Sequence, residues 1–120
     1  MGNLGEGRLS AGARFPERRN APRFAFEARL EIVDPLQQKQ ISGHVTVLSA
    51  KGCFGRTDTP LAQRGVMQVE IRKDGEVFET WAWATPSNPE AESGVVLVFM
   101  DTPPEQSKLL AQWLNGLAGS

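Results

Sequence analysis

Three arginines stand close together ahead of the first regularly patterned stretch of the chain. Arg18, Arg19 and Arg23 fall within the run RRNAPR at residues 18–23. Pro22 has no backbone N–H and pushes the residue before it away from helical geometry, so we expect an extended segment. A planar guanidinium pairs bidentately with phosphate or with the O6/N7 edge of guanine, and it stacks on bases. The segment has the chemistry of a clamp for a phosphorylated ligand. A solvated basic tail is the alternative that charge alone leaves open.

A second group of polar residues occurs in the run VLSAKGC at residues 47–53. Ser49 offers a hydroxyl, Lys51 a positive charge, and Gly52 a backbone without a side chain that an anion could approach closely. Taken alone, the pattern S-x-x-G is typical of an ordinary turn. Its position between two expected strands makes it a candidate ligand-binding loop.

The remaining reactive side chains do not suggest catalysis. The sequence around His44 gives it no Ser, Cys or acidic partner in a triad-like context, so we expect it on a strand face. Cys53 is the only cysteine; we expect it in the core, and it excludes an internal disulfide. One histidine and one cysteine cannot form the usual structural zinc site. We therefore predict no enzyme, no metal and no cofactor.

A period-two pattern of apolar residues indicates that most of the chain forms strands. The clearest example is FAFEARLEIV at residues 24–33, in which every second residue is apolar. Asp74-Gly75 favours a type I′ hairpin turn. We expect Trp81 and Trp83 to share one strand face, with at least one of them in the core. The predicted strands cover about residues 24–33, 40–48, 52–54, 66–71, 77–84 and 94–100, and we expect the last, GVVLVFM, to be buried on both faces.

Near the C-terminus the spacing of the apolar residues changes from the period of a strand to that of a helix. A helical stripe is formed by Leu109, Leu110, Trp113, Leu114 and Leu117.

The run TPPE at residues 102–105 has the form of a capping box, with Thr102 as N-cap and Pro103 as the first helical residue. Gly116 and Gly119 are expected to end the helix. Six short strands and one terminal helix predict a mainly β protein, an antiparallel barrel or half-barrel plugged by that helix.

Composition places the chain among soluble, single-domain proteins. Its 120 residues are 40% hydrophobic and 22% charged. No apolar run approaches the roughly 18 residues of a membrane span, and the first residues do not resemble a signal peptide. Together with the lone cysteine, this predicts a cytoplasmic location.

The net charge of −1 is unevenly distributed. Residues 1–29 hold six arginines and three glutamates, a net charge of +3, and the remainder holds seven basic and eleven acidic residues, a net charge of −4. The arginine excess could attract an anion, while the near-neutral whole argues against bulk nucleic-acid binding.

In this order and on this strand pattern, the two polar groups resemble the PilZ family. The family signature is R-x-x-x-R followed by (D/N)-x-S-x-x-G; Arg19 and Arg23 match the first part, and Ser49 and Gly52 the second. Arg18 matches a frequent additional arginine. The resemblance implies a split six-stranded barrel with a C-terminal helix. It further implies a cyclic di-GMP site made by Arg18, Arg19, Arg23, Ser49 and Gly52.

One residue departs from the signature. Val47 stands where the family carries Asp or Asn, a side chain that the resemblance implies helps to hold guanine. Losing such a hydrogen bond costs roughly 1–3 kcal/mol if its partner is left unpaired, which is about a tenfold to hundredfold loss of affinity.

The sequence thus predicts a mobile leader at residues 1–17, a PilZ-like domain at 18–117 and a tail at 118–120. The leading function is a non-catalytic cyclic di-GMP receptor that passes the signal to a protein partner. The alternative is a degenerate PilZ-like interaction module that does not bind the nucleotide. A small barrel for single-stranded nucleic acid and an enzyme are weaker alternatives, because the barrel region is acidic and lacks a catalytic arrangement.

Overall fold

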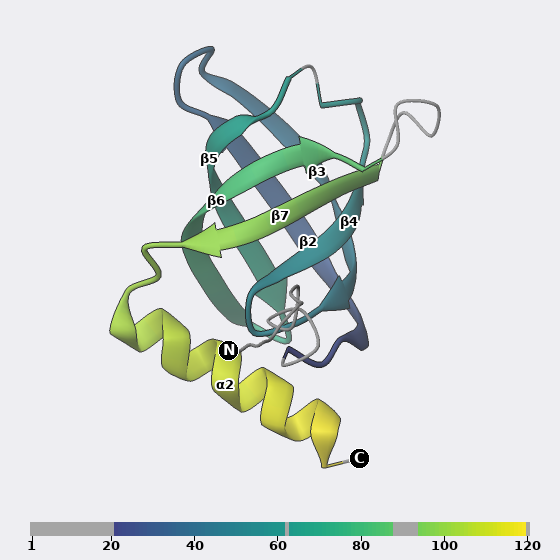
Figure 1. The fold of residues 1–120 in the computed structure, drawn as a ribbon, viewed down its shortest axis with the longest axis vertical. Coiled ribbons are helices and arrows are strands. Elements are labelled where there is room, and N and C mark those ends of the chain that lie inside the picture. The colour runs from purple at the N-terminus through teal and green to yellow at the C-terminus, as the bar shows by residue number, and fades with distance from the viewer. Residues whose placement is uncertain (1–20, 62, 88–93, 120) are drawn as a thin grey trace, which may run out of the picture.

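The computed structural model describes residues 21–61, 63–87 and 94–119. In these residues six antiparallel strands close into a barrel and one helix follows them (Figure 1). The elements are β2 (Phe24–Asp34), β3 (Lys39–Leu48), β4 (Gly52–Thr57), β5 (Gly65–Lys73), β6 (Glu76–Pro86), β7 (Gly94–Met100) and α2 (Pro104–Ala118). Around the barrel the strand order is β2-β3-β4-β7-β6-β5. The predicted six-stranded antiparallel barrel with a C-terminal helix is confirmed, and the ring is closed rather than half-open.

The barrel interior is filled by the apolar half of each alternating strand. In β2, Leu30 and Ile32 point inward and are fully buried, while Arg29, between Ala28 and Leu30, points out to solvent. This is the consequence expected of a period-two pattern in a sheet with one buried face. The largest fully buried side chains are Phe78, Leu30, Ile32, Leu48, Ile71, Leu97, Val45 and Val95.

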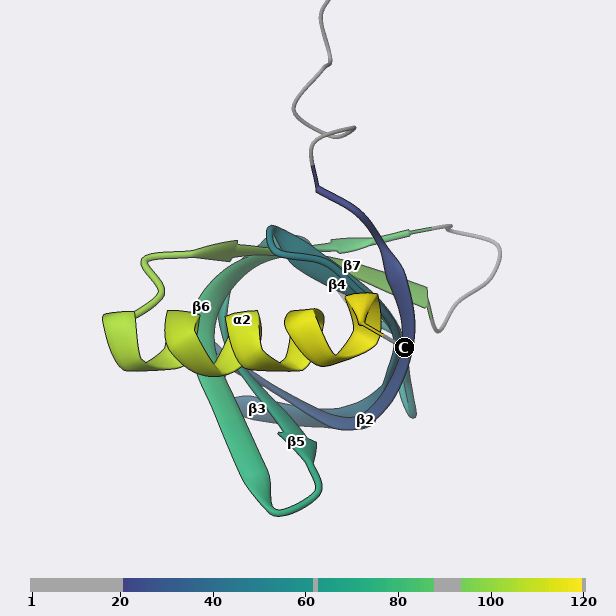
Figure 2. The same cartoon turned by 90° about the horizontal axis from the view of Figure 1, so that it is seen from below.

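Helix α2 lies across one end of the barrel (Figure 2). Leu110 is its buried residue, and the other four apolar residues of the stripe pack half-buried against the core. The ring of Trp113 lies 5.3 Å from that of Phe26, centroid to centroid. Its indole Nε1 donates a hydrogen bond to Glu76 Oε1 at 3.0 Å. The predicted stripe therefore does cover an end of the barrel.

The predicted capping box is wrong. The helix begins at Pro104, and Pro103 is an extended N-cap with φ −61° and ψ 151° that makes no side-chain cap hydrogen bond. The reason is the Pro-Pro pair, because a residue that precedes proline is held out of helical geometry. The Thr102 hydroxyl is instead hydrogen-bonded to that of Thr80 at 2.8 Å. At the other end, Gly119 caps the helix as predicted, but Gly116 lies within it.

Two predictions about burial are also wrong. Strand β7 is buried on its inner face only, because Val96, Val98 and Met100 are 37%, 49% and 36% exposed. Neither Trp81 nor Trp83 enters the core: Trp81 is half-buried and Trp83 is 44% exposed. Both indoles point outward because the residues that alternate with them, the small alanines 82 and 84, fill the barrel interior.

Two local predictions are confirmed. The β5–β6 turn has positive φ at both central residues, 53° at Asp74 and 84° at Gly75, as a type I′ hairpin requires. Cys53 is buried in the core, and burial raises the pKa of its thiol to about 12. The thiol therefore stays protonated at neutral pH and is not a nucleophile.

Candidate functional site

The two signature groups meet at one end of the barrel. Strands β2 and β3 are antiparallel with Phe24 opposite Leu48, so the start of β2 lies beside the end of β3. Arg23, exposed, directly precedes Phe24, and Ser49 directly follows Leu48. The topology therefore brings Arg23 to the Ser49–Gly52 turn, although Ser49 lies 26 positions after Arg23 in the sequence. Arg18 and Arg19 lie outside the described residues.

The Ser49–Gly52 turn is held by its own serine. The Ser49 backbone N–H donates to the Gly52 carbonyl at 2.9 Å, and the Ser49 hydroxyl donates to the same oxygen at 3.2 Å. The hydroxyl also accepts from the Lys51 N–H at 3.2 Å. Lys51 in turn accepts a hydrogen bond at its carbonyl from the Phe99 N–H at 2.9 Å. The turn is thus fixed to β7, and the Lys51 side chain extends into solvent.

Gly52 is required by the pairing of β4 with β7. It lies opposite Val98, and a Cβ at this position would collide with the carbonyl oxygen of Leu97. The neighbour is backbone, which cannot rotate away as a side chain would. In the described structure the absence of a side chain at Gly52 therefore allows β4 to pack against β7.

Val47 lies on the outer surface among other apolar groups. It is opposite Ala25 of β2 and Phe54 of β4. A bulge between Val45 and Val47 gives β3 one extra residue against β4, which sets Val47 beside Phe54. The valine is half-buried. The position where the signature expects a hydrogen-bonding side chain is therefore part of an apolar surface.

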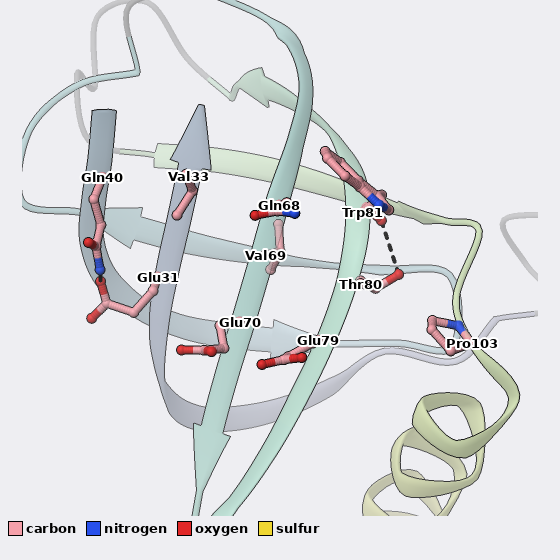
Figure 3. Close-up of a pocket in the computed structure, with 10 residues that line it drawn as sticks. All are labelled: Glu31, Val33, Gln40, Gln68, Val69, Glu70, Glu79, Thr80, Trp81 and Pro103. Carbon is pink, nitrogen blue, oxygen red and sulfur yellow. Dashed lines mark hydrogen bonds between the residues drawn. The ribbon is translucent and has the colours of Figure 1, made fainter. Parts of the chain in front are cut away.

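A concave surface that the sequence did not reveal lies elsewhere on the barrel. It is a cavity of about 390 Å³ over β2, β5 and β6 (Figure 3), and none of its lining residues belongs to the Ser49–Gly52 turn. Glu31, Glu70 and Glu79 are neighbours in adjacent strands there, since Glu31 is opposite Glu70 and Glu70 opposite Glu79. Trp81 and Pro103 complete one side of the cavity. No sequence signal could place these glutamates together, because their proximity depends on the pairing register of three strands.

The carboxylates of this cavity differ in their surroundings. The Ser42 hydroxyl donates to Glu31 Oε1 at 2.7 Å and holds the pKa of Glu31 below its usual value, with help from Gln40 and Arg29. Glu79 has the opposite shift. A hydrogen bond with the Glu70 carboxyl, burial and the negative charge of Glu70 together raise its pKa. Glu79 therefore keeps its proton more readily than an isolated glutamate does.

No group of three or more His, Cys, Asp or Glu side chains in residues 21–61, 63–87 and 94–119 could hold a metal ion. Over the same residues, no helix is long and apolar enough to cross a membrane.

Residues 17–116 match the model of the PilZ domain, a span that includes both signature groups and all six strands. The chain belongs to the PilZ domain family. No curated protein matches the chain.

Solved PilZ structures share the fold at low sequence identity. The PilZ domain of CeSA from a cellulose-synthesizing bacterium has 14% identity and a TM-score of 0.63, covering 81% of this chain and 98% of that one. The PilZ domain of YcgR from Escherichia coli, solved with cyclic di-GMP, has 15% identity and a TM-score of 0.65, with 84% and 92% covered. The Bacillus subtilis inhibitor of motility MotI/DgrA has 18% identity and a TM-score of 0.63, with 80% and 48% covered.

Proposed function

We propose that this PilZ domain is a non-catalytic receptor for cyclic di-GMP that acts in the bacterial cytoplasm. The observation that carries the proposal is the meeting of Arg23 with the Ser49–Gly52 turn, in a chain whose match to the PilZ model includes both signature groups. A structural relative, the PilZ domain of YcgR, was solved with cyclic di-GMP. In the proposed complex, Arg18, Arg19 and Arg23 contact phosphates and guanines, since guanidinium groups pair bidentately with both.

The turn has a supporting part in this proposal. Ser49 uses its hydroxyl to close the turn, accepting from Lys51 and donating to Gly52. Its role is to hold the turn in the conformation that contacts the nucleotide. The Lys51 ammonium adds a mobile positive charge that attracts phosphate. Because Ser49 already has both partners, its direct contact with the ligand contributes less than an arginine.

A second function is favoured by the surroundings of Val47. Ala25 and Phe54 flank it, so the missing hydrogen-bonding group is replaced by an apolar surface rather than by another polar residue. This is the observation expected of a PilZ domain that has become a protein-interaction module without nucleotide.

The test is a calorimetric titration of the chain with cyclic di-GMP at two salt concentrations. Arg19→Ala and Arg23→Ala should each weaken binding about tenfold or more, because a hydrogen bond to a charged group contributes roughly 1.5–3 kcal/mol. Each should also reduce the salt dependence. Arg72→Ala is the matched control, because it also removes an exposed arginine but at a distance from the proposed site. Arg72 lies opposite Arg29 of β2, and Arg29 is about 20 Å along that strand from Arg23.

Val47→Asp separates the two functions. In a receptor with a weakened pocket it should tighten binding about tenfold, by restoring a hydrogen bond to guanine. An absence of heat and of chemical-shift change for both the wild type and Val47→Asp would rule out the receptor and leave the interaction module.

A further inference from the structure

An exposed apolar row crosses the outer face of three strands. Val66 of β5 is opposite Trp83 of β6, and Trp83 is opposite Val98 of β7. These side chains are 41%, 44% and 49% exposed, and Val96 and Met100 of β7 extend the surface on either side. None of them contributes to the core. We refer to these five residues as the apolar row.

A row of carboxylates runs parallel to it on the same barrel. The acidic row consists of Glu31, Glu70 and Glu79, which are opposite one another on β2, β5 and β6. Both rows thus include β5 and β6. On β6, Trp83 is four positions after Glu79, a distance of about 13 Å along the strand. Between them, Trp81 lines the cavity beside the acidic row (Figure 3).

The acidic row has unused capacity for a cation. Arg29 pairs with Glu31, with Nε 3.2 Å from Oε2, and Arg72 pairs with Glu70, with Nη2 2.9 Å from Oε1. Within the described part of the chain, no cation lies within ion-pair distance of Glu79; Arg72 attracts it from further away, and Glu79 faces Glu70 across the strands. An added cation would relieve the repulsion between these two carboxylates.

The shape and size of the surface formed by the two rows favour one kind of binding partner over others. Every strand of the described barrel has a neighbouring strand on both sides, so the sheet has no edge strand to which a partner strand could be added. Five side chains, each about two-fifths exposed, amount to roughly 400 Å² of apolar surface, half of the ~800 Å² that each partner buries in a standard interface. That area suits a short segment better than a second copy of the domain. The spacing of the two rows is close to the ~10–12 Å diameter of a helix with its side chains.

We propose that this surface docks a basic amphipathic helix of a partner protein. The helix would lie across β5, β6 and β7, with its apolar side chains on Val66, Trp83 and Val98. Arginine or lysine residues on its flank would reach Glu70 and Glu79. The inference goes beyond nucleotide binding and does not depend on it, although Val98 lies opposite Gly52, so the docked helix would end beside the Ser49–Gly52 turn.

The experiment uses the complete 120-residue chain without nucleotide and two synthetic peptides. One is an amphipathic helix of roughly 18 residues, long enough to hold helical structure, with leucines on one face and arginines on the flank. Its twin has glutamate at every arginine. Binding is followed by ¹⁵N NMR. The indole N–H signals of Trp81 and Trp83 should shift with the arginine peptide, while that of Trp113, hydrogen-bonded to Glu76, serves as an internal reference.

Three variants make the test specific. Trp83→Ser should weaken the arginine peptide about tenfold, because an exposed aromatic at the centre of an interface carries much of its affinity. Glu79→Arg should reverse the preference between the two peptides. Asp58→Asn, which also removes one exposed carboxylate but at the end of β4, should leave both affinities unchanged. A reversed preference requires a folded protein, so it cannot arise from a variant that fails to fold.

Several outcomes would overturn the proposal. One is equal binding of both peptides, or shifts that do not include Trp81 and Trp83. Another is wild-type self-association in sedimentation that Trp83→Ser abolishes, which would assign the surface to a second copy. A third is movement of the Trp83 indole signal on deletion of residues 1–17 in the absence of peptide, which would assign the surface to the chain's own N-terminal residues.

Discussion

The Ser49–Gly52 turn and the outer face of β5 and β6 belong to one barrel, and their construction differs. The turn is four consecutive residues that hydrogen-bond to one another, with Arg23 brought alongside by one strand pairing. The acidic row takes one residue from each of three strands, and the apolar row takes its residues from three strands as well. A local site is visible in the sequence as a short signature. A surface assembled across strands becomes visible only when the pairing register is known, because a shift of one residue would turn every side chain to the other face.

The largest effect that would test this contrast is expected at Gly52. Gly52→Ala should destabilise the domain by about 3 kcal/mol, because the new methyl group meets the backbone carbonyl of Leu97. Gly65→Ala is the matched control, since a Cβ there has no heavy atom within 4 Å, and its effect should stay within about 0.5 kcal/mol. Urea unfolding of both variants measures the difference. If Gly52→Ala keeps full stability and loses only nucleotide affinity, the glycine serves the ligand and not the strand pairing.

A smaller effect is expected at Ser42, the serine that hydrogen-bonds to Glu31 of the acidic row. Ser42→Ala removes the hydrogen bond that does most to lower the pKa of Glu31, so that pKa should rise. A lowered carboxyl pKa stabilises the fold above the pKa of the unfolded chain, and this stability is lost as the pH falls through the folded-state pKa. The variant should therefore lose roughly 1 kcal/mol at neutral pH and less in acid. NMR titration of the Glu31 carboxyl and unfolding at two pH values check both parts; an unchanged Glu31 titration would contradict the assignment.

The smallest effect is expected at Glu79. Its pKa is raised, which means that the fold holds the proton more tightly than the unfolded chain does, so the associated stability is present in acid and is lost as the pH rises. Glu79→Gln should therefore stabilise the domain at neutral pH by roughly a few tenths of a kcal/mol, by removing a like charge opposite Glu70. Well below the pKa of Glu79, the variant and the wild type should have the same melting temperature. A variant that is less stable than the wild type at neutral pH would show that the carboxylate has a favourable partner.

The sequence predicted the strands and the helix better than it predicted the contacts around them. Alternation in residues 24–33 correctly identifies the inward residues of β2, and Asp74-Gly75 correctly identifies the hairpin. The start of α2 was missed because two signals competed: Thr102 looks like an N-cap, but Pro104 keeps Pro103 extended, and Thr80, 22 positions earlier, takes the Thr102 hydroxyl.

The predicted burial of β7 and of the two tryptophans was wrong for a related reason. An all-apolar run such as GVVLVFM does not reveal which face packs, and an indole suggests a core residue by its size alone. The small residues that alternate with Trp81 and Trp83 were the available signal, because a narrow barrel accepts alanine inside more easily than tryptophan. For the candidate site, the sequence supplied Arg23, Ser49 and Gly52, whereas the apolar neighbours of Val47 depend on a bulge in β3 that the pattern does not show.

The closed ring has a consequence for how the chain folds. Two of its pairings join distant parts of the sequence: Arg29 lies opposite Arg72, 43 positions on, and Gly52 lies opposite Val98, 46 positions on. Topologies dominated by such distant pairings fold on the order of milliseconds to seconds, because the entropy of closing long loops is lost before the contacts form. The β4–β7 seam cannot form until β7 has been synthesised, and Gly52 lies in that seam. A ribosome-bound chain that ends before Gly94 would therefore contain both signature groups while the ring that holds the Ser49–Gly52 turn in place is still open.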